Sequence, residues 1–352
     1  MSRCLQLAKN GLGTTFPNPL VGSVIVHNDQ IIGEGWHYKP GLPHAEVNAI
    51  KSVSSHATLL KEATLYVNLE PCSHFGQTPP CADLIISTGI RKVVIGSLDP
   101  NPKVAGRGIK KLRDSGCEVV SGVCVEECNE LNKRFFTFHN KKRPYIFLKW
   151  AQTGDGFIAP KKETRTETKP VWITNRFSRQ LAHKMRSEEM AILVGTNTVL
   201  DDNPSLTVRD WTGKNPMRVV IDKELKIPPK FSVLDGCVKT FVVTSKSKND
   251  DINPQDKFNY IQIDFSKEIA AQICDSLYQN DIQSLIVEGG AKTLQTFIDT
   301  NLWDEAFIFE GVARFGEGIL APVFKGNLKS ETAIKEDFLR HFKNQNLDGI
   351  CR

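Results

Sequence analysis

The sequence lacks the long apolar runs that characterise membrane proteins. No stretch approaches the ~20 consecutive apolar residues that a helix needs to cross a bilayer. Its nine cysteines are odd in number and follow no regular spacing, which argues against a disulfide framework and for a reducing compartment. The first residues also lack the apolar core of a signal peptide. These absences predict a cytoplasmic protein.

A strong charge of one sign is also missing. The formal net charge is +5, and residues 1–143 carry all of it, with 17 Lys and Arg against 12 Asp and Glu. This excess suits an anionic small molecule as well as nucleic acid, and it is too small to indicate a DNA-binding surface. With 352 residues and 40% apolar content, the chain is long enough for two domains that each have their own core.

Two alternating series of strand and helix patterns run along the chain, and no internal repeat relates them. The basic run Lys141-Lys142-Arg143 before Pro144 separates the two series, which predicts one domain over residues 1–143 and a second over residues 144–352. In the first series, the expected strands are Val21–His27, Ile31–Trp36, Thr64–Leu69, Arg91–Ser97 and Cys117–Ser121, and the expected helices are His44–Val53, Cys81–Ser87 and Gly106–Ser115. This order predicts a three-layer α/β domain.

The second series also alternates strands and helices. Its expected strands are Tyr145–Trp150, Met190–Gly195, Met217–Asp222, Lys239–Thr244 and Ser284–Glu288, and its expected helices are Asn175–Arg186, Ser266–Gln279 and Ala291–Thr300. In the first of these helices, Phe177, Leu181 and Met185 fall on one side. Beyond Lys325 the sequence is polar.

Three segments carry residue types that bind zinc: His44-Ala45-Glu46, Pro71-Cys72 and Pro80-Cys81. One imidazole and two thiolates suit Zn²⁺ and leave a fourth position open for water. His44 and Cys81 open expected helices, and a helix N-terminus favours a thiolate over a thiol. The glutamate after the histidine is placed to move protons, as in the zinc nucleobase deaminases. The motif predicts hydrolytic removal of an amino group from a purine- or pyrimidine-like ring.

Each of these residues, taken alone, has a more ordinary explanation than metal binding. An isolated histidine or cysteine is more often a packed side chain than a ligand, and only the combination favours zinc. The eight residues between Cys72 and Cys81 depart from the common Cys-x-x-Cys spacing, but they are rich in turn formers that can return Cys81 to the metal. His74 lies in this stretch, and a fourth protein ligand would indicate a structural site. A zinc-stabilised binding protein without catalysis is therefore an open alternative.

The second half carries a weaker signal. Glu288-Gly289-Gly290 stands between an apolar strand and a helix, where glycines let backbone N–H groups meet phosphate. A glycine pair at this place is most often only a tight turn. No Gly-x-Gly-x-x-Gly occurs there, so a standard Rossmann site is not supported. From the residues alone, a nucleotide or phosphate binder and a plain turn remain about equally favoured.

Over about residues 1 to 325, the chain resembles the bifunctional deaminase–reductases of riboflavin biosynthesis. In the first half the resemblance rests on FPNPLVG at 16–22, HAE at 44–46, EPCSHFGQTPPC at 70–81 and DPNPKVAGRG at 99–108. In the second half it rests on KWAQTGDG at 149–156, WIT at 172–174, RS at 186–187, AILVG at 191–195, TVLDDNPSLTVR at 198–209 and VEGG at 287–290. The long gap between the cysteines is this family's own form.

The resemblance implies a cytidine-deaminase-like three-layer first domain and a dihydrofolate-reductase-like second domain. It also implies two consecutive reactions on a small phosphorylated pyrimidine. The first is zinc-dependent hydrolytic deamination of a diaminopyrimidinone ribosylamine 5′-phosphate. The second is NADPH-dependent reduction of the ribosyl group to a ribityl chain. A homo-oligomer remains open, and neither nucleic acid nor a membrane is an expected partner.

The resemblance also implies the residues of both sites. One zinc ion per chain would be held by His44, Cys72 and Cys81, and Glu46 would be the proton donor and acceptor. The pyrimidine and ribose phosphate would be bound by Asn18, His74, Asp99 and Asn101. NADPH would contact Ala151, Trp172, Thr198, Asp202, Gly290, Ala291, Lys292 and Thr293. The substrate of the reduction would contact Arg186, Leu206, Arg209 and Glu288, and guanidinium groups suit its phosphate.

Two positions depart from the family pattern. Pro170 stands where the family usually has a serine or a similar donor to the substrate, so that contact must come from the backbone or be absent. Thr153-Gly154 replaces the usual Ser-Leu before Asp155-Gly156, which predicts a looser loop over the nicotinamide. The nearest rival function is a nucleoside or tRNA deaminase with a non-catalytic second domain.

Overall fold

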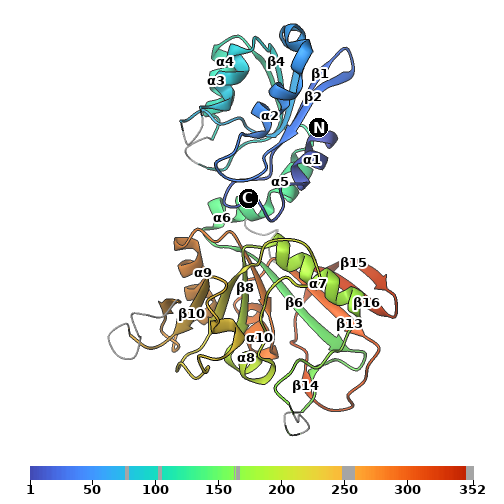
Figure 1. Cartoon of the computed structure of the whole chain (residues 1–352), viewed down its shortest axis with the longest axis vertical. Helices are drawn as coiled ribbons and strands as arrows, with labels where there is room; N and C mark the ends of the chain where they lie inside the picture. Colours follow the sequence, from blue (N-terminus) through green and yellow to red (C-terminus); the bar gives the residue numbers. More distant parts are fainter. Residues whose placement is uncertain (76–78, 102–104, 162, 164–166, 248–257, 346–352) are drawn as a thin grey trace. The chain divides into compact units, whose positions relative to one another are not determined.

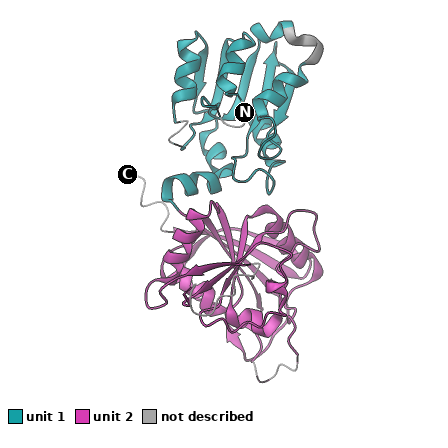
Figure 2. Ribbon diagram, turned by 60° about the vertical axis from the view of Figure 1, so that its left-hand side comes forward, with its two compact units in different colours: residues 1–142 teal, residues 143–352 magenta. Residues whose placement is uncertain are grey.

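The computed structural model describes residues 1–75, 79–101, 105–161, 163, 167–247 and 258–345. The chain divides into two compact units, Met1–Lys142 and Arg143–Arg352 (Figure 2). This division lies one residue before the boundary expected from the sequence. Among the described helices, none is long and apolar enough to cross a membrane.

The described part of the first unit is built on a five-stranded sheet with the order β2-β1-β3-β4-β5 (Figure 1). Its strands are β1 (Gly22–His27), β2 (Gln30–Trp36), β3 (Thr64–Leu69), β4 (Lys92–Ser97) and β5 (Glu118–Ser121). β1 runs antiparallel to β2 and β3, whereas β3, β4 and β5 are parallel to one another. Each strand lies within one residue of its predicted bounds. The carboxyl ends of β3 and β4 therefore meet at one edge of the sheet.

Helices cover both faces of this sheet. On one face, a single apolar cluster joins α2 (Ala45–Ser52), α3 (Cys81–Ser87) and α4 (Arg107–Asp114) to the central strands. The other face is covered by α1 (Ser2–Lys9), which packs on β1, and by α5 (Val125–Leu131), which packs on β4. The 3-10 helix Ser54–Lys61 and α6 (Lys133–Lys141) complete the unit. The three predicted helices are confirmed, and α1, α5 and α6 were not predicted.

The described part of the second unit contains a nine-stranded sheet with the order β11-β10-β9-β8-β12-β6-β13-β16-β15. The strands are β6 (Tyr145–Thr153), β8 (Ala191–Gly195), β9 (Met217–Ile221), β10 (Thr240–Thr244), β11 (Asn259–Gln262), β12 (Ser284–Glu288), β13 (Glu305–Gly311), β15 (Gly326–Ile334) and β16 (Asp337–Asn344). The first seven strands in this order, from β11 through to β13, are parallel to their neighbours. The hairpin of β16 and β15 adds to β13 in the antiparallel direction and ends the sheet. The polar end beyond Lys325 thus forms regular structure that the sequence did not predict. A separate pair joins β7 (Phe157–Ala159) to β14 (Ile319–Leu320).

Helices also cover both faces of the nine-stranded sheet. The larger apolar cluster joins one face to α9 (Ile269–Gln279) and α10 (Ala291–Asp299). On the other face lie α7 (Arg176–Glu188), α8 (Thr196–Asp202) and the 3-10 helix Ser232–Leu234.

The buried side of α7 carries mostly small and polar side chains. The buried residues of this helix are Ser178, Ala182, His183 and Ser187. Of the three apolar residues predicted to share one side, Phe177 is 38% exposed, whereas Met185 packs against the apolar cluster of this face. Small and polar side chains form the contact face because it lies over polar loops and the functional site as well as over the sheet.

Two candidate active sites

The three predicted zinc ligands lie together in the first unit. His44 is the N-cap of α2, Cys81 is the first residue of α3, and Cys72 follows the end of β3. Their ligand atoms all lie within 4.8 Å of one another. The Nδ1 atom of His44 is 3.3 Å from the Cys81 sulfur and 3.6 Å from the Cys72 sulfur. Tetrahedral zinc, with bonds of ~2.3 Å to sulfur and ~2.0 Å to nitrogen, separates such ligand atoms by ~3.5 Å. The donor set therefore fits zinc in both chemistry and spacing.

The surroundings of the two cysteines favour one thiolate. Hydrogen bonding from Cys81, opposed by burial and reinforced by His44, lowers the pKa of the Cys72 thiol to about 4. The backbone N–H of Cys81 also donates to the Cys72 sulfur at 3.3 Å. Because a thiolate is the form that binds metal, the protein presents Cys72 ready for ligation. Within the described residues, this is the one group of three or more possible ligands.

Glu46 lies beside the three candidate zinc ligands, in the first turn of α2. Its side chain is only 3% exposed. Burial, helped by the nearby Cys72, raises the pKa of the Glu46 carboxyl above its ordinary value. A carboxyl group with a raised pKa gains and loses a proton nearer to neutral pH, which suits a general acid and base.

The amide of Asn18, a predicted substrate residue, is oriented by His37. The His37 ring contacts the Pro43 carbonyl through Nδ1 at 3.2 Å and the Asn18 amide nitrogen through Nε2 at 3.0 Å. Because the carbonyl can only accept, Nδ1 carries the proton and Nε2 accepts from Asn18. The oxygen of the Asn18 amide is therefore left for another partner. His37 was not predicted as a site residue.

A buried carboxylate, Glu70, organises the loop that carries Asp99 and Asn101. It accepts hydrogen bonds from the backbone N–H groups of Asp99 at 3.3 Å, Gly106 at 2.9 Å, Gly108 at 2.9 Å and Ile109 at 3.2 Å. Three of these donors belong to the start of α4, so Glu70 also caps that helix. Burial raises the pKa of Asp99 to about 6, and its carboxylate accepts from the Asn101 N–H at 2.7 Å.

Glu70 stood in the sequence motif but was not predicted to have a role. A glutamate directly after an apolar strand was the available signal, because a charged side chain there must find partners if it is buried. Gly108 packs so closely that a side chain there would bring its Cβ to 2.0 Å from the Pro71 carbonyl. His74, by contrast, lies on an exposed turn.

In the second unit, charged residues gather where β12 ends beside the middle of β6. The Arg186 guanidinium donates to Glu288 at 2.6 Å and 3.3 Å, and the Lys149 ammonium lies 3.5 Å from the same carboxylate. Burial alone would raise the pKa of Glu288, but Arg186 and Lys149 outweigh it and lower the pKa to about 2. Burial also lowers the pKa of Lys149 below its ordinary value. Lys149 stood in a quoted motif, yet the sequence did not single it out.

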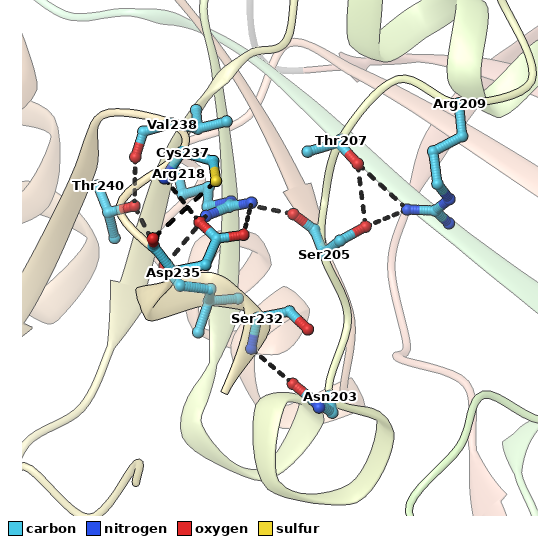
Figure 3. Close-up of polar contacts among 11 residues, drawn as sticks. Asn203, Ser205, Thr207, Arg209, Arg218, Ser232, Asp235, Cys237, Val238 and Thr240 are labelled. Atoms are coloured by element: carbon cyan, nitrogen blue, oxygen red, sulfur yellow. Dashed lines mark hydrogen bonds and ion pairs between the residues drawn. The ribbon is translucent and has the colours of Figure 1, made fainter. Parts of the chain in front are cut away.

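The loop Asn203–Asp210 brings Leu206 and Arg209 to the same region. Leu206 is 2% exposed and has a φ of +56°, a left-handed conformation that leucine rarely adopts. Arg209 contacts the hydroxyl groups of Ser205 and Thr207 within the loop, as Figure 3 shows. The Arg186 guanidinium also reaches the loop, at the Thr207 carbonyl. The structure thus brings Arg186, Glu288 and the loop with Arg209 together.

The predicted cofactor residues include the start of α10 and its neighbours. Gly290 is the N-cap of α10, and Ala291, Lys292 and Thr293 form its first turn. The Gly290 N–H donates to the Thr198 hydroxyl of α8 at 3.0 Å, and Gly289 has a φ of +107° that favours glycine. A nine-residue helix that begins directly after a parallel strand offers free N–H groups to a phosphate, so these residues fit a dinucleotide cofactor.

The remaining predicted cofactor residues lie on β6, on α8 and in the irregular segment before α7. Ala151 is on β6, and Asp202 ends α8. Trp172 is 57% exposed, and the Arg179 guanidinium stacks 4.5 Å above its ring. Pro170 lies in the exposed stretch before it.

Hydrogen bonds hold the turn at Thr153-Gly154 in place. The Thr153 hydroxyl bonds to the Asp155 carboxylate and accepts from the Phe157 N–H at 3.0 Å. Asp155 in turn accepts from Gly316 N–H at 2.8 Å, which ties the turn to the loop after β13. These contacts argue against the loosening that the sequence departure predicted.

Two protein families match the chain. Residues 1–97 match the cytidine and deoxycytidylate deaminase zinc-binding region, and residues 144–346 match the RibD C-terminal domain. The riboflavin biosynthesis protein RibD of Aquifex aeolicus is 45% identical over 321 residues, which cover 91% of this chain and 88% of that protein. RibD of Bacillus amyloliquefaciens is 41% identical over 330 residues, with 92% and 86% covered.

Solved structures agree over nearly the whole chain. The diaminohydroxyphosphoribosylaminopyrimidine deaminase/5-amino-6-(5-phosphoribosylamino)uracil reductase of Thermotoga maritima matches with a TM-score of 0.87 and 39% identity, covering 98% of this chain and 97% of that one. Acinetobacter baumannii RibD matches with a TM-score of 0.86 and 30% identity, covering 97% of each. The expected cytidine-deaminase-like first domain and dihydrofolate-reductase-like second domain are confirmed. The chain belongs to the RibD family, the bifunctional deaminase–reductases of riboflavin biosynthesis.

Proposed function

We propose that the first unit deaminates a diaminopyrimidinone ribosylamine 5′-phosphate and that the second unit reduces the ribosyl group of the product with NADPH. These are the substrate classes named for the Thermotoga maritima relative. The observation that carries the proposal is the convergence of His44, Cys72 and Cys81 beside the buried Glu46. A nucleoside or tRNA deaminase with a non-catalytic second domain is not favoured, because the second half matches a reductase family.

In the first unit, His44, Cys72 and Cys81 would hold one zinc ion per chain. Zinc in such a site supplies the Lewis acidity that lowers the pKa of a water from ~16 to ~7. Glu46, buried and with a raised pKa, would take a proton from that water and pass one to the departing amino group. Asn18, whose amide oxygen is left free by His37, would accept from an N–H group of the ring. The loop held by Glu70 would present Asp99 and Asn101 to the ribose phosphate.

In the second unit, NADPH would supply a hydride, and the residues of the site would bind and orient the two reactants. The N–H groups at the start of α10 are suited to a phosphate of the cofactor. Arg209, exposed and on a tightly held loop, is suited to the phosphate of the substrate. Glu288, held ionised by Arg186 and Lys149, would accept from substrate hydroxyl groups. Catalysis there depends on placing the nicotinamide against the sugar carbon.

The proposal is tested by assaying both steps on one purified sample. Ammonia release from the diaminopyrimidine substrate reports on the first unit, and NADPH oxidation with the deaminated substrate reports on the second. We expect both activities, and we expect a chelator to abolish ammonia release while sparing NADPH oxidation. Loss of neither activity would contradict the zinc assignment, and loss of both together would contradict the separation of the two sites. We also retain the prediction of a cytoplasmic enzyme that acts on small molecules and not on nucleic acid.

A further inference from the structure

The conformation of the loop 203–210 depends on contacts with residues outside the loop. Its buried Leu206 has a φ of +56°, a left-handed conformation that is strained for a residue other than glycine. Such a conformation persists only where the surroundings over-determine it. The Arg209 guanidinium contacts the Ser205 and Thr207 hydroxyls of the same loop, so its direction follows the loop backbone.

Two arginines hold the carbonyl groups of the loop. Arg218 on β9 is fully buried, and its Nε donates to the Ser205 carbonyl at 2.9 Å while its Nη1 pairs with Asp235 at 2.7 Å (Figure 3). Arg186 on α7 donates to the Thr207 carbonyl at 3.4 Å. These contacts fix the first part of the loop, before Arg209.

One side chain, His183, holds the N–H groups at the other end of the loop. Its Nδ1 accepts from the Arg209 N–H at 2.8 Å and from the Asp210 N–H at 3.3 Å. Because a backbone N–H can only donate, Nδ1 carries no proton, and the ring is the neutral tautomer with its hydrogen on Nε2. His183 is 2% exposed and lies on the buried side of α7, one turn before Arg186.

The charges around His183 keep it in this acceptor form. Burial is the largest influence on its pKa, the positive charges of Arg186 and Arg209 lower it further, and Asp210 and Glu288 oppose them. The resulting pKa is about 4. If Nδ1 carried a proton, this N–H group would face the two backbone N–H groups of Arg209 and Asp210, and none of the three could accept. The ring would also become a third positive charge beside two arginines.

We propose that His183 is a positioning residue that orients Arg209 toward the phosphate of the substrate. The inference rests on the proposed function, in which Arg209 binds that phosphate. His183 acts through the backbone at 209 and 210, so its loss should weaken recognition of the phosphate without removing a group that reacts. The hydroxyls of Ser205 and Thr207 then hold the guanidinium on the loop that His183 has fixed.

Two substitutions of His183 separate this role from simple packing. His183→Asn keeps an acceptor oxygen at the place of Nδ1, whereas His183→Gln moves its acceptor to the place of Nε2. For the deaminated substrate with its 5′-phosphate, we expect His183→Gln to raise KM about 10-fold with kcat within about twofold of wild type. His183→Asn should stay close to wild type. For the same substrate without its phosphate, neither variant should change KM.

The controls use the same chain. His341→Gln changes a histidine of β16 in the same unit and should leave both KM values unchanged. Ammonia release by the first unit should be unaffected in every variant, and a kcat within about twofold of wild type for NADPH oxidation shows that the second unit is folded. Below pH ~5, KM of the wild type should rise more steeply than that of His183→Asn, because asparagine cannot take up a proton.

The outcomes distinguish the inference from the proposed function. If Arg209→Ala abolishes the preference for the phosphorylated substrate but His183→Gln preserves it, the inference is wrong and the proposed function stands. If Arg209→Ala preserves the preference, the phosphate role of Arg209 is wrong, and the inference fails with it. Equal losses in His183→Asn and His183→Gln, on both substrates, would show that His183 only packs.

Discussion

Arg186 and Glu288 form a nearly buried ion pair with a nitrogen–oxygen distance of 2.6 Å, and each side chain is about one-tenth exposed. Lys149 adds a second positive charge 3.5 Å from the same carboxylate. A carboxylate in such surroundings stays ionised far into the acidic range, because neutralising it would leave two buried cations without their partner. The reductase site therefore contains a fixed negative charge enclosed by positive ones.

This pair makes the stability of the second unit depend on acid pH. The ordinary pKa of a glutamate is 4.5, and that of Glu288 is about 2. As the pH falls from about 4.5 to about 2, the unfolded chain takes up a proton that the folded chain excludes, so the free energy of unfolding decreases. We expect a contribution of up to ~3 kcal/mol, present above pH ~4.5 and lost below it.

Glu288→Gln should remove this dependence. Urea unfolding followed by the fluorescence of Trp150 and Trp303, both buried in the second unit, measures it at several pH values. We expect the wild type to lose stability more steeply than Glu288→Gln between pH 4.5 and 3. Parallel curves for the two proteins would mean that the carboxyl of Glu288 has an ordinary pKa.

Glu46→Gln should separate metal binding from proton transfer. The amide keeps the shape of the side chain but cannot shuttle a proton, a role typically worth ~10²–10⁴-fold in rate. We expect zinc content to stay at about one per chain, as metal analysis would report, while ammonia release falls by that factor. NADPH oxidation with deaminated substrate should continue. Near-normal ammonia release would assign the acid–base role to another group.

Cys81→Ser should weaken the metal site itself. A serine hydroxyl is a poor substitute for a thiolate, and the remaining His44 and Cys72 offer only two of the three protein ligands. We expect lower zinc occupancy after dialysis and loss of ammonia release. Cys117→Ser is a matched control, because Cys117 is a buried cysteine of the same unit outside the cluster. Full occupancy and activity in Cys81→Ser would contradict the ligand assignment.

Glu70→Gln should disturb the loop that carries Asp99 and Asn101. The glutamine amide nitrogen would face backbone N–H groups that now meet a carboxylate, and a buried donor without an acceptor costs ~1–3 kcal/mol. We expect the first unit to be destabilised by that amount and KM for the deamination to rise. Glu62→Gln is the matched control, since the Glu62 side chain is 77% exposed. Unchanged stability and KM in Glu70→Gln would show that the carboxylate is dispensable.

The metal cluster could be predicted because its signals are local. Few side chains bind zinc, and His44, Cys72 and Cys81 each stand at an element boundary that the apolar pattern of the sequence marks. The strands of the first sheet and five strands of the second, β6, β8, β9, β10 and β12, were predicted for the same reason, since each is a short apolar run with turn formers beside it. The family resemblance then supplied the remaining site residues.

The positioning residues could not be predicted in this way. Glu70 accepts hydrogen bonds from N–H groups 29 to 39 residues further along the chain. His183 accepts hydrogen bonds from N–H groups 26 and 27 residues further along. No local pattern reports a contact at such a distance. The β15–β16 hairpin was missed because its outer strand is largely exposed.

Gly108 shows how far the metal site extends into residues that have no chemistry of their own. Its Cα stands so near the Pro71 carbonyl that even an alanine would displace the backbone directly before Cys72. A genetic screen for loss of the first activity would therefore return changes at position 108 together with changes at the ligands. Gly108 on the site side and Ile109 and Leu112 in the apolar core are the buried residues of α4, so this helix is free to vary only on its solvent side.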